Sequence, residues 1–456
     1  MNSLTEPARQ TPVAGSYDVI VAGAGTAGIF AAIASARNGA RTLLLERMGF
    51  MGGHIATQLL EHSAGWFDAK GDPIVGGLPE ELCRRLIEAN ASPGHVSDDT
   101  GYTKFRLPVD HEAFKSVITG WLAEEGVDFL VYSPVVSLLE TDEGPALIVE
   151  NKSGRQAYLA KALVDCTGDA DICALGGSQF LSRPGDITQP VSILFKIGGI
   201  DHEVLLDYVC ANPSQFKLGV DPRTLYGQRF VNLWGFGDIL AKGYAEGLLS
   251  LERAEFHYAG ETTTGEAVIN ATRVAADATD ALSLSRAEAV LRKQVLEFVA
   301  FFRKYLPGGA NAHLVATAAC VGIRESRRIK GMSVLTDEDV RSARRFDDAI
   351  CRGGFPIDSH DAQGKSMAEA EHVPSGYDIP LSCLIPSTGT NVIVAGRCIS
   401  AERRALASAR ITGTCMAMGQ AAGTAAALAA GAGVPFRALD AELVRTTLRA
   451  QGALLL

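Results

Sequence analysis

The chain has 456 residues, of which 47% are hydrophobic and 21% are charged. This length and balance are typical of two globular domains, or of one domain with a large insertion. Its 42 basic and 52 acidic residues give a formal net charge of −10, which argues against a broad face for nucleic acid or for an anionic membrane. We therefore expect small-molecule chemistry.

The first residues carry neither an apolar run nor a basic flank, and no segment approaches the ~20 apolar residues of a membrane span. We expect a cytoplasmic protein in which residues 1–15 form a loose tail. Its nine cysteines include no CxxC pair, and most lie in apolar segments. They indicate neither a disulfide framework nor a metal site, and we expect no metal.

The stretch YDVIVAGAGTAG at residues 17–28 joins an apolar strand to a helix through three glycines. Gly23 permits the tight turn, Gly25 lets the backbone approach a pyrophosphate, and Gly28 lets the helix pack on the strand. The start of the helix adds free N–H groups and the positive end of its dipole. This pattern predicts a dinucleotide-binding turn.

The next residues complete a βαβ unit around this motif. A helix is expected over residues 31–39 and a second strand over residues 40–45. Glu46 closes that strand about 20 residues after the motif, where a ribose hydroxyl is usually held. The complete unit favours a dinucleotide site over a glycine turn in some other parallel sheet.

Further along the chain, residues 58–106 are rich in glycine and mixed in polarity, and are expected to cap or interrupt the first domain. A helix is expected over residues 110–125. Five strands should follow, at residues 127–131, 135–139, 146–150, 157–159 and 162–166, with the third and fourth paired as a hairpin.

From residue 191 the pattern is less regular, with helices expected over residues 285–305 and near 315–322. We expect a substrate domain over residues 191–380. The nucleotide-binding domain is then expected in two parts, residues 16–190 and residues 381–456.

A late strand over residues 391–395, a turn at Gly396 and Arg397, and a helix over residues 413–430 matter for the cofactor. A flavin needs a site for its ring system, and a second helix N-terminus can stabilise negative charge on the reduced ring. Gly413 and Thr414 would let the backbone approach a flat ligand. The alternative is that the small residues of this helix serve only tight packing.

Five segments, taken in order, resemble the FAD-dependent oxidoreductase family. They read VIVAGAGTAGIFAAIASARNGARTLLLERMGFMGG, DCTGDADICALGG, GIRESRRIKGMSVLTDEDV, FPIDSHD and NVIVAGRCISAERRALASARITGTCMAMGQAAGTAAALAAG. The resemblance implies an α/β fold of the glutathione-reductase type, distantly related to fumarate reductase and succinate dehydrogenase flavoproteins. A Rossmann-like FAD-binding domain with a three-layer ββα architecture would carry an inserted mixed α+β substrate domain.

The resemblance also implies FAD as cofactor. The pyrophosphate would lie on the glycine-rich turn, the ribose on Glu46 and the adenine against the backbone of Val135. The residues implied to bind FAD are Gly23, Gly25, Thr26, Ala27, Gly28, Glu46, Arg47, Gly52, Gly53, His54, Val135, Thr167, Gly168, Asp169, Gly396, Arg397, Gly413 and Thr414. For Asp169, a helix cap is a compatible second role.

The absence of several known motifs narrows the range of reactions that the chain could catalyse. A disulfide reductase of this fold would carry a redox CxxC and a second GxGxxG, and this chain has neither. The halogenase motif WxWxIP is missing, and a block AGRCISA stands where aromatic hydroxylases show a GDAAH-like one. These differences argue against all three chemistries.

Two histidines are candidates for the chemistry. His54 lies eight residues after Glu46, roughly where succinate dehydrogenase-like proteins attach FAD covalently; covalent attachment, substrate binding and packing all stay open for it. His360 is implied to lie near the active site as an acid or base. The alternative is a surface-loop histidine between Asp358 and Asp361.

Arginines provide candidate anion sites. Arg324, Arg327 and Arg328 share an expected helical segment with Glu325, and could grip an anionic substrate or a phosphate, or else form solvated ion pairs. Arg410, just before the late helix, is better placed to hold a carboxylate or carbonyl. Weaker candidates are His62 and Tyr377.

We therefore expect an FAD-dependent oxidoreductase that moves a hydride between flavin N5 and a small organic substrate. A separate electron donor or acceptor is expected, without nucleic acid or membrane partners, and a homo-oligomer stays open. The alternatives are a flavin oxidase that uses oxygen and, from another class, an FAD-containing RNA-modification or scaffold protein.

Overall fold

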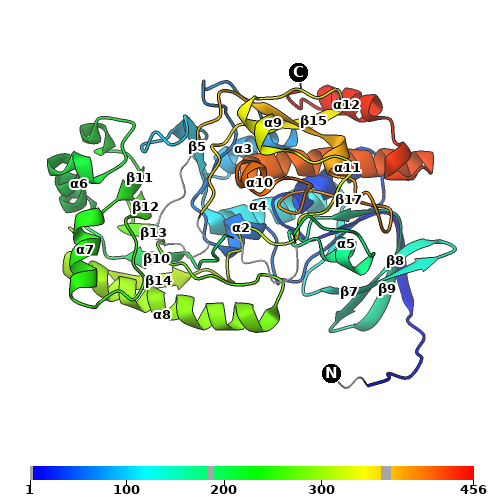
Figure 1. The fold of residues 1–456 in the computed structure, drawn as a ribbon, viewed down its shortest axis with the longest axis horizontal. Helices are drawn as coiled ribbons and strands as arrows, with labels where there is room; N and C mark the ends of the chain where they lie inside the picture. Colours follow the sequence, from blue (N-terminus) through cyan, green and yellow to red (C-terminus); the bar gives the residue numbers. More distant parts are fainter. Residues whose placement is uncertain (1–3, 183–188, 361–370, 456) are drawn as a thin grey trace.

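Figure 1 shows the computed structural model of the chain, which describes residues 4–182, 189–360 and 371–455. Two bodies lie side by side in this view. The body on the left is built on the strands β10 to β14, and the body on the right on a larger sheet that includes β7, β8, β9 and β17.

The larger sheet has a parallel part and an antiparallel part. The parallel strands, in spatial order, are β6 (Asp128–Leu130), β2 (Thr42–Leu45), β1 (Val13–Ala22), β9 (Gly154–Asp165) and β17 (Val392–Val394). The first half of β9 also pairs antiparallel with β8 (Gly144–Asn151), which pairs with β7 (Val135–Thr141). The expected Rossmann-like α/β class is confirmed.

Two helices from opposite ends of the chain pack against this sheet and against each other. They are α1 (Gly28–Arg37) and α11 (Thr412–Ala432), which Figure 1 shows in orange through the middle of the right-hand body. A Cβ on Gly419 would lie 2.0 Å from the carbonyl oxygen of Ala27, and one on Gly423 would lie 2.1 Å from that of Ala31. The small residues of α11 therefore allow backbone-to-backbone packing, as the packing alternative expects.

The rest of the right-hand body surrounds this centre. Its remaining elements are α2 (Gly53–Thr57), β3 (His62–Ser63), α3 (Leu78–Glu88), β4 (Val96–Ser97), β5 (Phe105–Pro108), α4 (His111–Glu124), α5 (Asp171–Leu175), α9 (Asp337–Arg341), β15 (Ala349–Gly353), β16 (Tyr377–Pro380), α10 (Arg403–Ala409) and α12 (Ala441–Ala450). Asp110 caps α4 as its carboxylate accepts hydrogen bonds from two first-turn N–H groups, which explains where that helix begins.

The left-hand body is an antiparallel sheet covered by helices. Its strands, in spatial order, are β11 (Phe230–Gly235), β12 (Phe256–Glu261), β13 (Glu266–Asn270), β10 (Phe195–Gly198) and β14 (His313–Thr317). Its helices are α6 (His202–Ala211), α7 (Gly237–Ala245) and α8 (Ala281–Tyr305). The apolar face of α8 brings Phe298, Phe301 and Phe302 into the core of this body.

The core of the left-hand body runs from Val191 to Ile323. Ile329, Leu335 and Tyr377 belong instead to the core of the right-hand body. The expected substrate domain, residues 191–380, therefore extends beyond the core of the left-hand body, because residues in its last part pack in the core of the right-hand body.

Four local expectations differ from the structure. Residues 13–15 of the expected tail belong to β1, which pairs with β9, and the strands expected at residues 157–159 and 162–166 are one continuous strand. The helix expected near residues 315–322 is wrong, because residues 313–317 form β14 on the free edge of β10. Residues 324–328 are not helical, because they cross between the two bodies.

In the described part of the chain, none of the helices combines the length and the apolar character that crossing a bilayer would require.

Candidate functional site

A cavity of about 560 Å³ lies against the carboxyl ends of the parallel strands, where ligands of such sheets bind. Ser192, Leu194 and Asn270 of the left-hand body also line it, so both bodies build the cavity. The candidate cofactor residues in its wall are Gly23, Gly25, Thr26, Ala27, Glu46, Arg47, Gly53, His54, Val135, Thr167, Gly168, Asp169, Gly396 and Arg397.

Four candidate cofactor residues lie outside this lining: Gly28, Gly52, Gly413 and Thr414. A Cβ on Gly28 would lie 1.8 Å from the carbonyl oxygen of Gly23, so Gly28 allows the helix to pack on the strand. The N–H of Gly413 donates to the carbonyl of Ala64. At this end of the cavity the wall is formed by Ile411, Thr412 and Cys415 instead.

The turn between β1 and α1 is shaped to receive a ligand. Gly23 has φ +94°, and a Cβ there would meet the backbone of Cys166 at 2.5 Å. At Gly25 the nearest atom to an added Cβ is the Cα of Gly53, at 3.8 Å, so no side chain separates the backbone of Gly25 from the cavity. No side chain caps α1 at Ala27, which leaves first-turn N–H groups for an anion.

Glu46 holds the edge of this turn. Its carboxylate accepts hydrogen bonds from the N–H of Ala24 at 2.7 Å and from the N–H of Met48 at 2.8 Å. Both contacts use the carboxylate as an acceptor, the role that ribose hydroxyls would also require. Glu46 therefore ties the end of β2 to the glycine-rich turn at the cavity wall.

A mostly buried ion pair between Arg397 and Asp169 lines the cavity. Arg397 donates to the carboxylate of Asp169 at 2.8 Å and to the hydroxyl of Ser326 at 2.7 Å. Burial acts to raise the pKa of Asp169, but Arg397 and Ser326 outweigh it and hold that pKa below its usual value. Asp169 is not the cap of α5; the hydroxyl of Thr167 accepts the N–H of Asp171 there.

His54 projects into the cavity from α2. Its side chain is exposed to the cavity although it lies deep in the molecule. Burial, with the positive charges of Arg397 and Arg410, lowers the pKa of His54 to about 4. The imidazole is therefore neutral at physiological pH.

His360 and Arg410 meet at Asp358. The imidazole Nε2 of His360 lies 3.4 Å from a carboxylate oxygen of Asp358, and Arg410 lies 3.6 Å from the other. His360 is only 7% exposed, and burial lowers its pKa to about 4. Burial opposes ionisation of Asp358, but His360, Arg410 and Arg324 together lower its pKa. Asp361 lies outside the described residues.

The three candidate arginines at residues 324–328 do not share one face. Arg324 lines the cavity and donates to the carbonyl of Pro190 and the hydroxyl of Ser192. Arg327 pairs with Asp171, and Arg328 donates to the carbonyl of Ala401. Only Arg324 of the three lines the cavity, because Arg327 and Arg328 bond to other segments.

A second cavity of about 160 Å³ adjoins the first, and His62, Asp358 and His360 line both. The weaker candidate His62 is thus placed between them. Tyr377 lines neither, and its hydroxyl is bonded to Ser408.

Sequence reasoning missed several residues of the smaller cavity. They are Glu61, Asp98, Tyr102, Arg106, Asn232, Trp234, Arg253, His257 and Arg273. Most belong to residues 58–106 or to the left-hand sheet. No sequence motif links either segment to the glycine-rich turn. Their spacing along the chain gives no indication that they lie together in the fold.

The chain matches the family described as FAD dependent oxidoreductase over residues 18–448. Two curated relatives are named tRNA uridine 5-carboxymethylaminomethyl modification enzyme MnmG. The one from Bacillus subtilis (strain 168) is 72% identical over 216 residues, covering 46% of this chain and 32% of that protein. The one from Lactococcus lactis subsp. cremoris (strain MG1363) is 24% identical over 230 residues, with the same shares. The chain thus spans about a third of the length of these relatives.

Solved structures resemble the chain in fold. The p-nitrophenol 4-monooxygenase PnpA from Pseudomonas putida DLL-E4 has a TM-score of 0.48 and 11% identity, with 95% of this chain and 81% of that chain covered. A geranylgeranyl bacteriochlorophyll reductase-like protein from Thermoplasma acidophilum has a TM-score of 0.46 and 13% identity, with 96% and 84% covered.

Proposed function

Because the chain belongs to the FAD-dependent oxidoreductase family, an enzyme family with FAD as cofactor, we propose that it moves a hydride between flavin N5 and a small organic substrate. The observation that carries this proposal is the junction of the two cavities, where Asp358 and His360 line both. A substrate in the smaller cavity would there meet both the flavin site and a group able to move a proton.

The residues of the larger cavity fit FAD. The bare backbone at Gly25 and the uncapped N-terminus of α1 suit a pyrophosphate. Glu46 suits the ribose, and the uncapped N-terminus of α11, at Ile411, suits the negative charge of a reduced ring. We propose that these groups hold the cofactor, and that the left-hand body serves as the substrate domain.

Bound FAD supplies the hydride acceptor or donor. The side chains of this chain position the substrate and move the proton. Arg324 and Arg410 are cations that would hold a carboxylate or carbonyl oxygen. His360 would take or give the proton at its imidazole, since it is neutral and held by the Asp358 carboxylate.

Anaerobic mixing tests this proposal. The purified flavoprotein should be combined with a panel of acids, ketones, enones and alcohols while its visible absorbance is followed. Bleaching by one class, lost in His360→Asn with full FAD content, supports the proposal. No response from oxidised or dithionite-reduced protein to any class contradicts it. Oxygen consumption during turnover would assign the reaction to an oxidase.

His54 has a separate question, covalent attachment of the flavin. Its imidazole is neutral and faces the cavity, so it could serve as a nucleophile towards the flavin. Acid precipitation followed by a spectrum of the pellet tests this. A pellet that is yellow for wild-type protein and colourless for His54→Ala would establish the covalent bond. A colourless wild-type pellet would exclude it.

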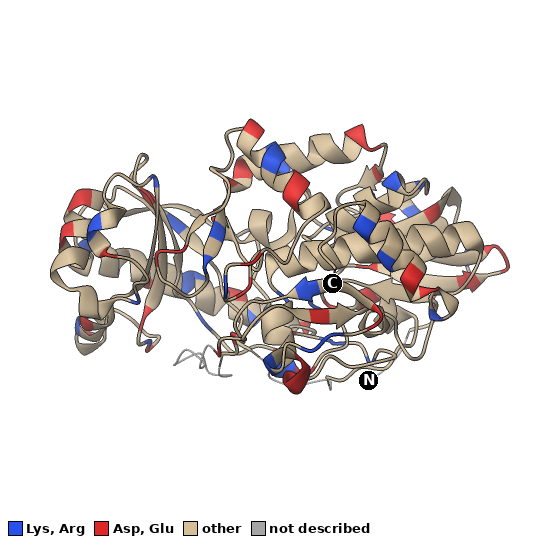
Figure 2. Cartoon of the chain, turned by 90° about the horizontal axis from the view of Figure 1, so that it is seen from above, with Lys and Arg blue, Asp and Glu red and all other residues tan. Residues whose placement is uncertain are grey.

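Action on tRNA is the second candidate function, favoured only by the names of the partial relatives. Basic and acidic residues are interspersed over both bodies in Figure 2, and the net charge is −10. We therefore expect no shift of tRNA mobility at low salt. A salt-sensitive shift would revive this candidate.

A further inference from the structure

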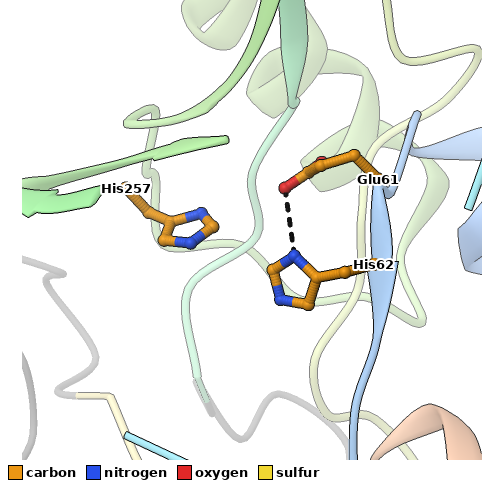
Figure 3. Close-up of side chains that lie close together, drawn as sticks. All are labelled: Glu61, His62 and His257. Atoms are coloured by element: carbon orange, nitrogen blue, oxygen red, sulfur yellow. Dashed lines mark ion pairs between the residues drawn. The ribbon is translucent and has the colours of Figure 1, made fainter. Parts of the chain in front are cut away.

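Three side chains from the two bodies converge in the wall of the smaller cavity. Glu61 directly precedes β3 and His62 begins it in the right-hand body, and His257 comes from β12 in the left-hand body. Their ligand atoms all lie within 4.8 Å of one another. Figure 3 shows the two imidazoles and the carboxylate gathered around one point.

The distance between Glu61 and His62 suits a shared ion better than a hydrogen bond. The carboxylate oxygen Oε1 of Glu61 and the Nδ1 of His62 are 3.4 Å apart. Two ligands at about 2.0 Å from a tetrahedral metal ion lie about 3.3 Å from each other. The other carboxylate oxygen of Glu61 and the Nδ1 of His62 are buried without a hydrogen-bond partner among the described residues.

A second layer of contacts fixes His257. Its Nε2 is hydrogen-bonded to the amide oxygen of Asn232, whose amide nitrogen donates to Asp98 at 2.8 Å. The Asp98 carboxylate thereby orients the amide, so the Nε2 of His257 carries the proton and its Nδ1 keeps the lone pair. Metal-binding histidines are oriented in this way by outer-shell acceptors.

We propose that Glu61, His62 and His257 bind one divalent metal ion of the zinc type, with the fourth position open to the cavity. Two histidines and one glutamate form a ligand set of catalytic zinc sites. Asp98 adds negative charge beside the imidazoles, and Arg106, which pairs with Asp99 at 2.9 Å, also lies 4.0 Å from Asp98. If the proposed function holds, the ion would polarise a substrate oxygen next to the flavin.

Zinc binding to the intact flavoprotein tests the site. Protein treated with EDTA should be dialysed against buffered Zn²⁺, and bound zinc counted per chain by elemental analysis. We expect one zinc per chain, and at least a tenfold loss of affinity in Glu61→Gln, His62→Ala and His257→Ala. FAD content and circular dichroism identify any variant that fails to fold.

A second cluster supplies the matched control. Glu80, Cys83 and His95 also have ligand atoms within 4.8 Å of one another, but the carboxylate of Glu80 is already bonded to His95 at 3.1 Å. His95→Ala should keep the zinc.

Two results would overturn the site: no stoichiometric zinc on wild-type protein, or zinc lost in His95→Ala and kept in folded His257→Ala. Zinc is counted without turnover. Failure of the metal site is therefore distinguishable from failure of the hydride-transfer proposal.

Discussion

His360 lies where the two cavities meet, with its imidazole held by Asp358. If it moves the substrate proton, His360→Asn should lower the rate of flavin reduction by about 10²–10⁴-fold, the usual contribution of a general acid or base. FAD content should not change, because His360 is not among the residues proposed to hold the cofactor. Stopped-flow absorbance measures the rate. His313→Asn, on the exposed edge of β14, is the control and should match wild type.

The lowered pKa of His360 also predicts how the free energy of unfolding depends on pH. Burial lowers its pKa in the folded protein to about 4, below the value of 6.5 for a free histidine. The unfolded chain therefore binds the proton more readily, and stability is lost as the pH falls from about 6.5 towards 4. Urea midpoints at pH 7 and pH 4.5 should differ less in His360→Asn than in wild type. An equal difference in the two proteins would contradict the lowered pKa.

At the residue scale, sequence reasoning was strongest where a motif has a local cause. Gly23, Glu46 and Arg397 lie in one wall, as the family resemblance implies. The late helix begins at Thr412, one residue before its expected start, and Ile411 and Thr412 line the cavity where Gly413 and Thr414 were expected. The residues of the smaller cavity were missed because tertiary packing alone brings them together.

At the scale of elements, α1 and α11 pack closely against each other, and residues at the tips of both helices line the proposed FAD site. Gly419→Val in α11 would force a side chain against the carbonyl of Ala27, at 2.0 Å. We expect a loss of about 1–3 kcal/mol or more in the free energy of unfolding, together with weaker FAD binding. Thermal melting and FAD titration measure the two effects.

The same helix offers an exposed glycine as a control for that experiment. Gly431 is exposed near the end of α11, and nothing lies within 4 Å of an added Cβ. Gly431→Ala should be neutral or stabilise by up to about 1 kcal/mol, through helix propensity. Equal effects of Gly419→Val and Gly431→Ala would show that close packing does not explain the small residues.

Elements were predictable where hydrophobic periodicity and caps agree, as in α4 and the hairpin of β8 and β9. They were not predictable where pairing with another strand determines the secondary structure. Residues 313–317 form a strand because the edge of β10 is available, although the alanines at positions 316, 318 and 319 also suit a helix. The segment 324–328 has no regular secondary structure, and its arginines bond to Pro190 and Asp171 instead of sharing a helix face.

At the scale of the whole molecule, both bodies share the walls of the larger cavity, the proposed FAD site. A ligand that binds only the folded protein adds RT ln(1 + [L]/Kd), about 2.7 kcal/mol at one hundred times Kd. FAD should therefore raise the melting temperature of the left-hand body along with that of the right. Differential scanning calorimetry with and without FAD tests this. A left-hand transition unchanged by FAD would contradict a shared site.

The central claim is that FAD binds with its pyrophosphate at the tip of α1. Gly25→Asp tests it most directly, because the position has room for a side chain and an acid at a helix N-terminus does not disturb the fold. Like charges at short range near a surface repel by about 4 kcal/mol. The control is Gly120→Asp, on the exposed side of α4.

FAD titration, followed by flavin fluorescence, is the decisive measurement. The account predicts one FAD per wild-type and Gly120→Asp chain, and at least tenfold weaker binding to folded Gly25→Asp. Undiminished binding to Gly25→Asp, or a colourless wild-type protein that refuses added FAD, would contradict it.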